Sequence, residues 1–365
     1  MARNYLMYAG TYTQTGSPPT HRDEGIFVFR FDAETGALER LSAAGGAQNP
    51  SFLALHPNGG FLYAVSEILD YQGKESGAVH AYMRDRTTGA LAHLNSQAAI
   101  GTWPCHLSVD TSGRYVLAAN YLSGSVVMLP IRTDGSLGEA SDFVQHQGSS
   151  ANPQRQEGPH AHSIMVAPDN RFAFAPDLGL DQVVAYKLDL ERGKLVPNDA
   201  PHTRTAPGAG PRHFDFHPNG RWAYLINEIG NTLSAYAYDA GRGALTLLNT
   251  VPTLPADFGG TSHTADVHVH PSGKFVYGSN RGHDSIVIGA IDQGTGQVTV
   301  VGHESTQGKT PRNFAIDPTG AFLLAANQST DNIVVFRIDP QSGRLSPTGH
   351  SAQAPAPVCL KLIPA

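Results

Sequence analysis

The chain has 365 residues, a formal net charge of −6 at pH 7 and only 15% charged residues. This acidic balance gives no support to a nucleic-acid surface or an anionic-membrane patch, and no run of 18 apolar residues predicts a membrane-spanning helix. Glycine (39) and proline (25) are frequent, which is typical of many short strands joined by turns and not of helices.

The two cysteines, Cys105 and Cys359, lie far apart in the sequence and predict no disulfide framework, which is compatible with a reducing compartment. The N-terminus carries one early positive charge but lacks the apolar segment of a signal peptide, and its first residues read as a strand. We therefore expect a cytoplasmic protein.

In chain order, residues 6–13 and 26–31 are the first predicted strands, and from residue 49 onward one hairpin pattern recurs. Its clearest copy spans residues 210–228, where aromatic and β-branched residues alternate on both sides of a His-Pro-Asn-Gly turn. The complete copies are residues 49–67, 103–120, 159–177, 210–228, 264–280 and 311–327.

Each hairpin is followed by a third predicted strand, a glycine turn and a weaker fourth strand. The third strands are residues 79–82, 126–131, 183–188, 233–238, 286–291 and 333–338. The glycine turns, however, occur once more than the hairpins, at Gly36, Gly89, Gly135, Gly193, Gly243, Gly296 and Gly343. The N-terminus therefore starts in the middle of a unit whose first strand is missing.

The missing strand is predicted at the opposite end of the chain, in residues 357–363, where it would complete the first unit and close a ring. The sequence thus predicts an all-β fold: a seven-bladed β-propeller of four-stranded antiparallel blades, closed by the C-terminal strand, in one domain covering residues 1–365. The absence of a Trp-Asp dipeptide argues against the WD40 type. Longer loops at residues 142–158 and 252–263 are expected to lie over the ring.

An antiparallel hairpin brings its two open ends together, so first-strand starts and second-strand ends should share one rim of the ring. This rim is predicted to collect many convergent polar groups around a cavity, which is the usual pattern of a small-molecule site. The candidates are Glu67, His106, Asn120, His160, His162, Arg212, His213, Glu228, Asp266, His268, Arg281 and Arg312. Three histidines directly before a proline, His56, His217 and His270, are expected in turns on the opposite rim.

Other interpretations of these residues exist. The spacing of His160 and His162 would suit two metal ligands on one strand face, but no third ligand has a fixed spacing to them, so we predict neither a metal nor any other cofactor. The charged rim groups could also tie blades together. Arg212, Arg281 and Glu228 together, however, leave uncompensated positive charge that an anionic ligand would offset.

The motifs on this rim resemble those of the seven-bladed propeller lactonases, which include propeller-type 6-phosphogluconolactonases and 3-carboxy-cis,cis-muconate lactonizing enzymes. The resemblance covers essentially the whole chain and rests on Gly-Pro-Arg-His with a strand-end Asn-Glu, Ala-His-Ser, Ala-Asp-Val-His with Asn-Arg, and Thr-Pro-Arg-Asn. It implies catalytic roles for His162, Arg212, Glu228 and Arg281, with the other rim candidates at nearby substrate-binding positions. One departure is Pro176, which falls in the second strand of its blade.

The expected function is hydrolysis of a small anionic sugar lactone, 6-phosphogluconolactone first of all, with neither nucleic acid nor membrane as partner. In this scheme His162 takes the proton of a water molecule, because an unperturbed imidazole has a pKa near neutrality, and Glu228 orients it or acts as its acid–base partner. Of Arg212 and Arg281, one stabilises the oxyanion and the other holds the substrate's phosphate or carboxylate.

Two alternatives stay open. The same acid–base groups could run the intramolecular addition of a carboxymuconate-type lactonizing cyclase. A ligand-binding or scaffold propeller without catalysis is the other possibility, although a rim rich in titratable groups favours an enzyme.

Overall fold

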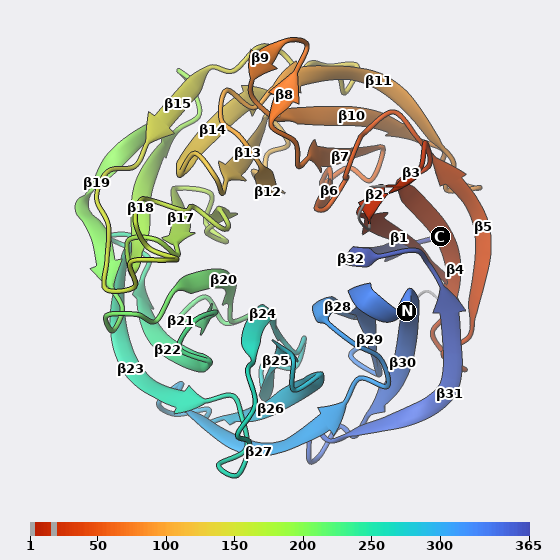
Figure 1. Ribbon diagram of the computed structural model, residues 1–365, viewed down its shortest axis with the longest axis vertical. Helices are drawn as coiled ribbons and strands as arrows, with labels where there is room; N and C mark the ends of the chain where they lie inside the picture. The colour runs from red at the N-terminus through yellow and green to blue at the C-terminus, as the bar shows by residue number, and fades with distance from the viewer. Residues whose placement is uncertain (1–3, 16–19) are drawn as a thin grey trace.

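The computed structural model describes residues 4–15 and 20–365, and its main body is a ring of seven four-stranded antiparallel sheets (Figure 1). The predicted closed seven-bladed propeller is confirmed. None of the helical segments in the described residues has the length and apolar character needed to cross a membrane.

The strands of each blade run from the centre of the ring outwards. Blades 1 to 4 consist of β32 (Pro357–Pro364), β1 (Asn4–Thr11), β4 (Ile26–Asp32) and β5 (Leu38–Ala44); β6 (Leu53–Leu55), β7 (Phe61–Ser66), β10 (Ala78–Arg84) and β11 (Leu91–Ala98); β12 (Pro104–Val109), β13 (Tyr115–Asn120), β14 (Ser125–Pro130) and β15 (Asp142–Gln145); and β16 (Met165–Val166), β17 (Phe172–Asp177), β18 (Gln182–Asp189) and β19 (Lys194–Arg204). Blades 5 to 7 consist of β20 (Pro211–Phe216), β21 (Trp222–Asn227), β22 (Thr232–Asp239) and β23 (Ala244–Pro252); β24 (His263–Val269), β25 (Phe275–Arg281), β26 (Ser285–Ile291) and β27 (Val298–Ser305); and β28 (Pro311–Ile316), β29 (Phe322–Asn327), β30 (Asn332–Ile338) and β31 (Leu345–Gln353).

Three smaller elements lie outside the blades. They are the hairpin of β2 (Gln14–Thr15) and β3 (Thr20–His21), the hairpin of β8 (Asp70–Tyr71) and β9 (Lys74–Glu75), and the 3₁₀ turn η1 (Gln328–Thr330).

The ring closes where the C-terminal strand β32 pairs antiparallel with β1, from Tyr5 opposite Pro364 to Thr11 opposite Pro357. In Figure 1 the two ends of the chain accordingly lie beside each other in blade 1. This pairing confirms the predicted closure and leaves β1 between β32 and β4.

Both faces of a blade are buried, because each blade packs between two others. In β1, Leu6 and Tyr8 belong to the apolar cluster shared with blade 2, whereas Tyr5 and Met7 belong to the one shared with blade 7. Successive side chains of a strand point to opposite faces, so a strand between two blades is apolar at every position.

The turns on the rim opposite the strand ends join each blade to the next. In those turns the Nδ1 atoms of His56, His217 and His270 accept a backbone N–H at 3.0–3.1 Å, so the proton is on Nε2. Each Nε2 donates to a glycine carbonyl in the corresponding turn of the next blade at 2.8–3.0 Å. The turn roles predicted for these histidines are therefore confirmed.

The structure differs from the expected strands in two places. Residues 142–145 form β15, so the long loop of blade 3 begins at residue 146 and not at 142. In blade 4 the second strand continues through Pro176, but the first strand is reduced to β16 and one bridge between Ala161 and Asp177.

Candidate active site

A cavity of about 260 Å³, here called the inner cavity, lies at the rim where the second strands end. Its lining combines arginines, carboxylates and histidines with aromatic and thiol groups: Glu67, Trp103, Cys105, Tyr121, Arg155, His162, Glu228, His263, Arg281 and Arg312. These residues come from blades 2 to 7 and the loops between them, so closure of the ring is what gathers them.

The second strands present side chains to this cavity through a repeated clamp. In three blades a buried asparagine near the strand end donates its amide N–H to a serine hydroxyl of the third strand at 3.1–3.2 Å: Asn120, Asn227 and Asn280. The residues that line the inner cavity are the next ones along the chain, namely Tyr121, Glu228 and Arg281. Asn120, predicted to bind substrate, thus serves as a clamp, and Tyr121 takes the place at the cavity.

The first strands aim side chains at the same place through bulges. In blades 3, 5 and 7 the pairing register skips one residue near the strand start, and the skipped residues are Cys105, Arg212 and Arg312. A bulge redirects the side chain of the extra residue and is common beside active sites. Cys105 and Arg312 line the inner cavity, and Arg212 reaches one of its lining residues, Glu228.

The Glu228 carboxylate is the centre of the charge arrangement. Its Oε2 accepts hydrogen bonds from Arg212 Nε at 2.9 Å and pairs with an Arg281 NH2 group at 2.8 Å, while its Oε1 accepts from Arg155 at 2.6 Å. Burial alone raises the pKa of the Glu228 carboxyl, but Arg281 and Arg212 outweigh burial and hold that pKa well below its ordinary value. Glu228 is therefore ionised at neutral pH.

His162 lies beside this cluster with its imidazole neutral. Its Nε2 is 3.9 Å from Glu228 Oε2, and its Nδ1 is 3.6 Å from the Cys105 sulfur. Burial lowers the pKa of His162 well below its ordinary value, and the positive charge of Arg212 lowers it further. A neutral imidazole facing a cavity can accept a proton from water.

Arg212 is held from behind by a hydrogen-bonded series of side chains along the ring centre. His213 donates Nδ1–H to Asp266 Oδ1 at 2.7 Å, because a carboxylate only accepts, and its Nε2 then accepts from Arg212 at 3.2 Å. Asp266 Oδ2 in turn pairs with His268 Nε2 at 2.9 Å. Burial and then Arg212 lower the pKa of His213 to about 4, which keeps this histidine neutral.

The predicted site residues thus fall into two groups. Glu67, His162, Glu228, Arg281 and Arg312 line the inner cavity, with Arg212 directly behind Glu228. The remaining predicted residues are placed away from its lining: His106 stacks on Phe52, His160 stacks on Tyr121, His213 and Asp266 brace Arg212, and His268 lines a shallow pocket with Lys361 and Leu362.

Several lining residues were not among the sequence candidates. Arg155 comes from the long loop of blade 3 and reaches across to Glu228, which shows that this loop covers the site. No periodic pattern surrounds Arg155, so nothing in the sequence signals it. Tyr121 could have been found, because it follows Asn120 as Glu228 follows Asn227.

The structure also bears on metal binding. In the described part of the chain, no three His, Cys, Asp or Glu side chains are grouped so that they could hold a metal ion. His160 and His162 are separated by their partners, because His160 contacts Glu157 at 3.2 Å whereas His162 faces Cys105 and Glu228.

Comparison with known proteins agrees with this geometry. The family model described as "Lactonase, 7-bladed beta-propeller" matches residues 6–362. The 6-phosphogluconolactonase of Bacillus subtilis is 39% identical over 313 residues, which cover 86% of this chain and 85% of the relative. The 6-phosphogluconolactonase of Formosa agariphila is 37% identical, with 85% of this chain and 86% of the relative covered.

Among solved structures, the periplasmic gluconolactonase of Pseudomonas aeruginosa superposes with a TM-score of 0.91 at 36% identity, covering 99% of both chains. The match of the family model along nearly the whole ring, together with these relatives, means that the chain belongs to the seven-bladed β-propeller lactonase family.

Proposed function

We propose that the protein hydrolyses 6-phosphogluconolactone to 6-phosphogluconate in the inner cavity. As a member of the lactonase family it is a lactone-opening carboxylic-ester hydrolase, and two relatives bear the name of this specific activity. The observation that carries the choice of an anionic lactone is an excess of guanidinium groups over carboxylates: Arg155, Arg212, Arg281 and Arg312 against Glu67 and Glu228. A phosphate would offset this positive charge.

In the proposed mechanism His162 takes a proton from the water that attacks the lactone carbonyl. A bound phosphate offsets the positive field of the arginines, so substrate binding raises the pKa of His162 toward neutrality and makes it a stronger base. The resulting imidazolium then gives the proton to the ring oxygen that leaves as an alkoxide, and the histidine is neutral again at the end of the turnover.

Arg281 is proposed to stabilise the oxyanion. Its NH2 group is anchored by Glu228 at 2.8 Å and by the Thr264 carbonyl at 2.9 Å, whereas its buried Nε has no hydrogen-bond partner among the described residues. An unused donor that points from a fixed guanidinium suits charge that develops only in the transition state.

Arg312 is proposed to hold the substrate's phosphate. Within the described residues no carboxylate lies at ion-pair distance from its guanidinium, which instead contacts the Tyr12 ring at 5.5 Å. Arg212, one of the two arginines to which the sequence assigned this task, is engaged by Glu228, His213 and the Ala265 carbonyl. Glu228, ionised and shared by three arginines, orients them and is not a proton donor in this scheme.

Replacing Arg312 by alanine tests the proposal. We expect kcat/KM for 6-phosphogluconolactone to fall about 100-fold, since a charge-assisted bidentate contact is lost, while kcat/KM for unphosphorylated glucono-1,5-lactone changes less than about threefold. The measurement is continuous titration of released acid, corrected for spontaneous opening, with Arg114→Ala as a surface control because Arg114 pairs only with exposed Glu191. Equal losses on both lactones would remove Arg312 from phosphate recognition.

The same preparation separates the rival functions. Cyclisation of carboxymuconate without hydrolysis of any lactone would replace the proposal with the lactonizing reaction, and silence on all these compounds would favour a non-catalytic propeller. The cytoplasmic location expected from the sequence stays a prediction, and one similar solved structure is described as periplasmic.

A further inference from the structure

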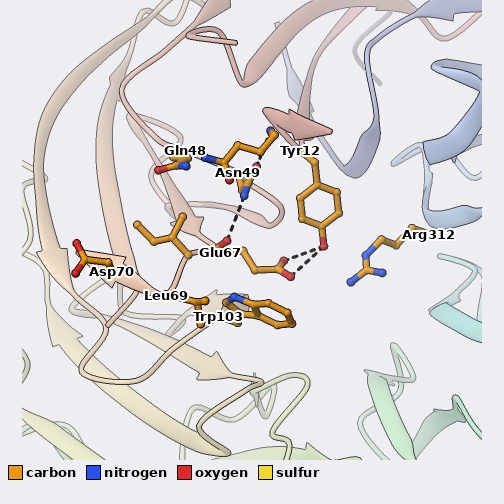
Figure 2. Close-up of a pocket in the computed structure, with 10 residues that line it drawn as sticks. Tyr12, Gln48, Asn49, Glu67, Leu69, Asp70, Trp103 and Arg312 are labelled. Carbon is orange, nitrogen blue, oxygen red and sulfur yellow. Dashed lines mark hydrogen bonds between the residues drawn. The ribbon is translucent and has the colours of Figure 1, made fainter. Parts of the chain in front are cut away.

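A second cavity of about 860 Å³, here called the outer compartment, adjoins the inner cavity on the side of blades 1 and 2 (Figure 2). Glu67, Trp103 and Arg312 line both, so one ligand can extend from the inner cavity into the outer compartment. The proposed reaction itself needs only the groups of the inner cavity. The outer compartment is more than three times as large and has no role in that mechanism.

The walls of the outer compartment come largely from two insertions that the propeller does not need for closure. The connection between the second and third strands spans residues 12–25 in blade 1 and 67–77 in blade 2, but only 121–124 in blade 3 and 228–231 in blade 5. The long connections contain the hairpins β2–β3 and β8–β9. They supply Tyr12, Gln14, Glu67, Ile68, Leu69 and Asp70 to the lining.

Trp103 is the shared wall between the two cavities. It precedes the first strand of blade 3 with φ 52°, a left-handed conformation that is costly for a bulky residue. The equivalent left-handed position before Pro is Asn49 in blade 2, Gly210 in blade 5 and Thr310 in blade 7. The Trp103 indole is 37% exposed, while its backbone is fixed by bonds to Ile68 O at 3.1 Å and from Tyr121 N at 2.9 Å. The structure therefore holds a flat apolar surface in place where a ligand can stack on it.

The charge of the lining changes sign from one cavity to the other. The inner cavity has more guanidiniums than carboxylates, whereas the outer compartment has the single guanidinium of Arg312 against the carboxylates of Glu67 and Asp70. Its other polar groups are the neutral amides of Gln14, Gln48 and Asn49. Figure 2 shows Gln48 and Asn49 on one side of Glu67 and Arg312 on the other. A second anion would be disfavoured there, and a neutral group with many hydroxyls would be matched.

We infer that the outer compartment is a subsite for a second, neutral sugar ring, so that the enzyme opens aldonolactones that carry a further glycosyl unit. The inference rests on the proposed lactonase function: the lactone ring lies in the inner cavity and the appended ring stacks on Trp103, with its hydroxyls facing Gln48, Asp70 and Glu67. The reaction is the same hydrolysis, in which water adds across the lactone C–O bond and no other reactant is needed.

The test compares three lactones: glucono-1,5-lactone, 6-phosphogluconolactone, and the 1,5-lactone of maltobionic acid, which is gluconolactone with glucose attached at O4. The wild-type enzyme is expected to open the disaccharide lactone with a kcat/KM at least equal to that for glucono-1,5-lactone. Trp103→Ala should lower kcat/KM for the disaccharide lactone about tenfold or more and change that for glucono-1,5-lactone less than about threefold.

Two further variants make the result independent of folding. Gln48→Ala removes an exposed amide that lines the outer compartment only, and it should weaken the disaccharide lactone selectively, by about threefold. Leu122→Ala removes an exposed side chain of the same rim that lines neither cavity and should change no substrate.

The possible outcomes separate the two claims. If the enzyme opens one or both monosaccharide lactones but the disaccharide lactone at least tenfold less well, or if Trp103→Ala lowers all substrates equally, the sugar subsite is refuted and the lactonase function stands. If none of the three lactones is opened, both the proposed function and the subsite fall.

Discussion

His162 and Glu228 take opposite charge states from one set of neighbours, although their side chains approach to 3.9 Å. The arginines that keep the Glu228 carboxylate ionised also disfavour a positive charge on His162. Because Arg281 and Arg212 both contact Glu228, the three form a single electrostatic unit. An anion that enters this unit changes the ionisation of His162 more than that of Glu228, whose carboxylate already has three cationic partners.

The pH–rate profile should report this coupling. In the free enzyme the pKa of His162 is lowered, so the imidazole stays neutral as pH falls through 6.5, and the acid limb of kcat/KM should lie below pH 6. A bound phosphate raises that pKa, so the acid limb of kcat for 6-phosphogluconolactone should lie at higher pH than that of kcat/KM. Stopped-flow rates between pH 4.5 and 8 provide the check, with glucono-1,5-lactone expected to show a smaller separation. An acid limb of kcat/KM at or above pH 6.5 would exclude His162 as the base.

At this scale the sequence located side chains correctly where the rim argument applied and missed them by one register position where it did not. Second-strand ends correctly placed Glu67, Glu228 and Arg281 at the cavity, but Asn120 was taken where Tyr121 is the lining residue. The asparagine is a clamp because its amide faces the third strand, a direction that periodicity alone does not reveal.

The recurring elements are the glycine turns between third and fourth strands, all seven of which have positive φ, from 61° at Gly243 to 83° at Gly36 and Gly135. In four blades a tyrosine of the second strand donates its hydroxyl to the glycine carbonyl of the next blade's turn at 2.8–3.1 Å: Tyr8, Tyr63, Tyr224 and Tyr277. These turns therefore serve two purposes, since they reverse the chain and position the next blade.

Gly243→Ala should separate the backbone cost from the packing cost of such a turn. A Cβ at Gly243 would lie 2.3 Å from Phe172, and the residue has φ 61°, so we expect a loss of about 3 kcal/mol in unfolding free energy. Gly220→Ala is the matched control, because Gly220 has φ 67° but open space around its Cβ, and it should lose only about 1 kcal/mol. Urea denaturation measures both, and equal losses would show that the contact with Phe172 adds nothing.

Element existence was readable from the sequence, but element edges were not. The glycine turns and the alternation of aromatic residues marked the strands of every complete unit, and the structure confirms them. The bulges at Cys105, Arg212 and Arg312 were not predicted, because a bulge is set by pairing with the neighbouring strand. The short first strand of blade 4 has the same origin, since pairing and not residue type limits it.

The whole ring depends on strand β32, whose side chains Val358, Cys359 and Leu360 are almost completely buried. Leu360 packs in the cluster of blades 1 and 7, and the Cys359 sulfur accepts a hydrogen bond from the backbone N–H of Leu53 in blade 2. One strand from the end of the chain thus contacts three blades, and its pairing covers an otherwise open edge of β1.

Leu360→Ala should show whether the ring unfolds as one unit. Removing a side chain that is only 2% exposed should cost about 3 kcal/mol. In a cooperative ring the loss appears at distant sites too, so the fluorescence of Trp222, which is buried in blade 5, should report the same lowered denaturation midpoint as far-UV circular dichroism. An unchanged midpoint for Trp222 beside a lowered one for circular dichroism would mean that blade 1 opens separately.

At the scale of the molecule, counting was sufficient: seven glycine turns against six hairpins located the closing strand before any coordinates were considered. The contribution of the loops could not be counted in this way. Arg155 reaches Glu228 from a connection without periodicity, and the hairpins β2–β3 and β8–β9 are visible only as extra length between strands.

The asparagine clamps separate the parts of each blade that hold the sheet together from the positions that recognise a ligand. Tyr121, Glu228 and Arg281 occupy equivalent sites in blades 3, 5 and 6, yet they carry an aromatic ring, an acid and a base. Exchanging one such side chain leaves the strand pairing beneath it intact, so natural variation can alter substrate preference one blade at a time. A propeller built in this way offers evolution a set of independently adjustable contacts around a shared reaction centre.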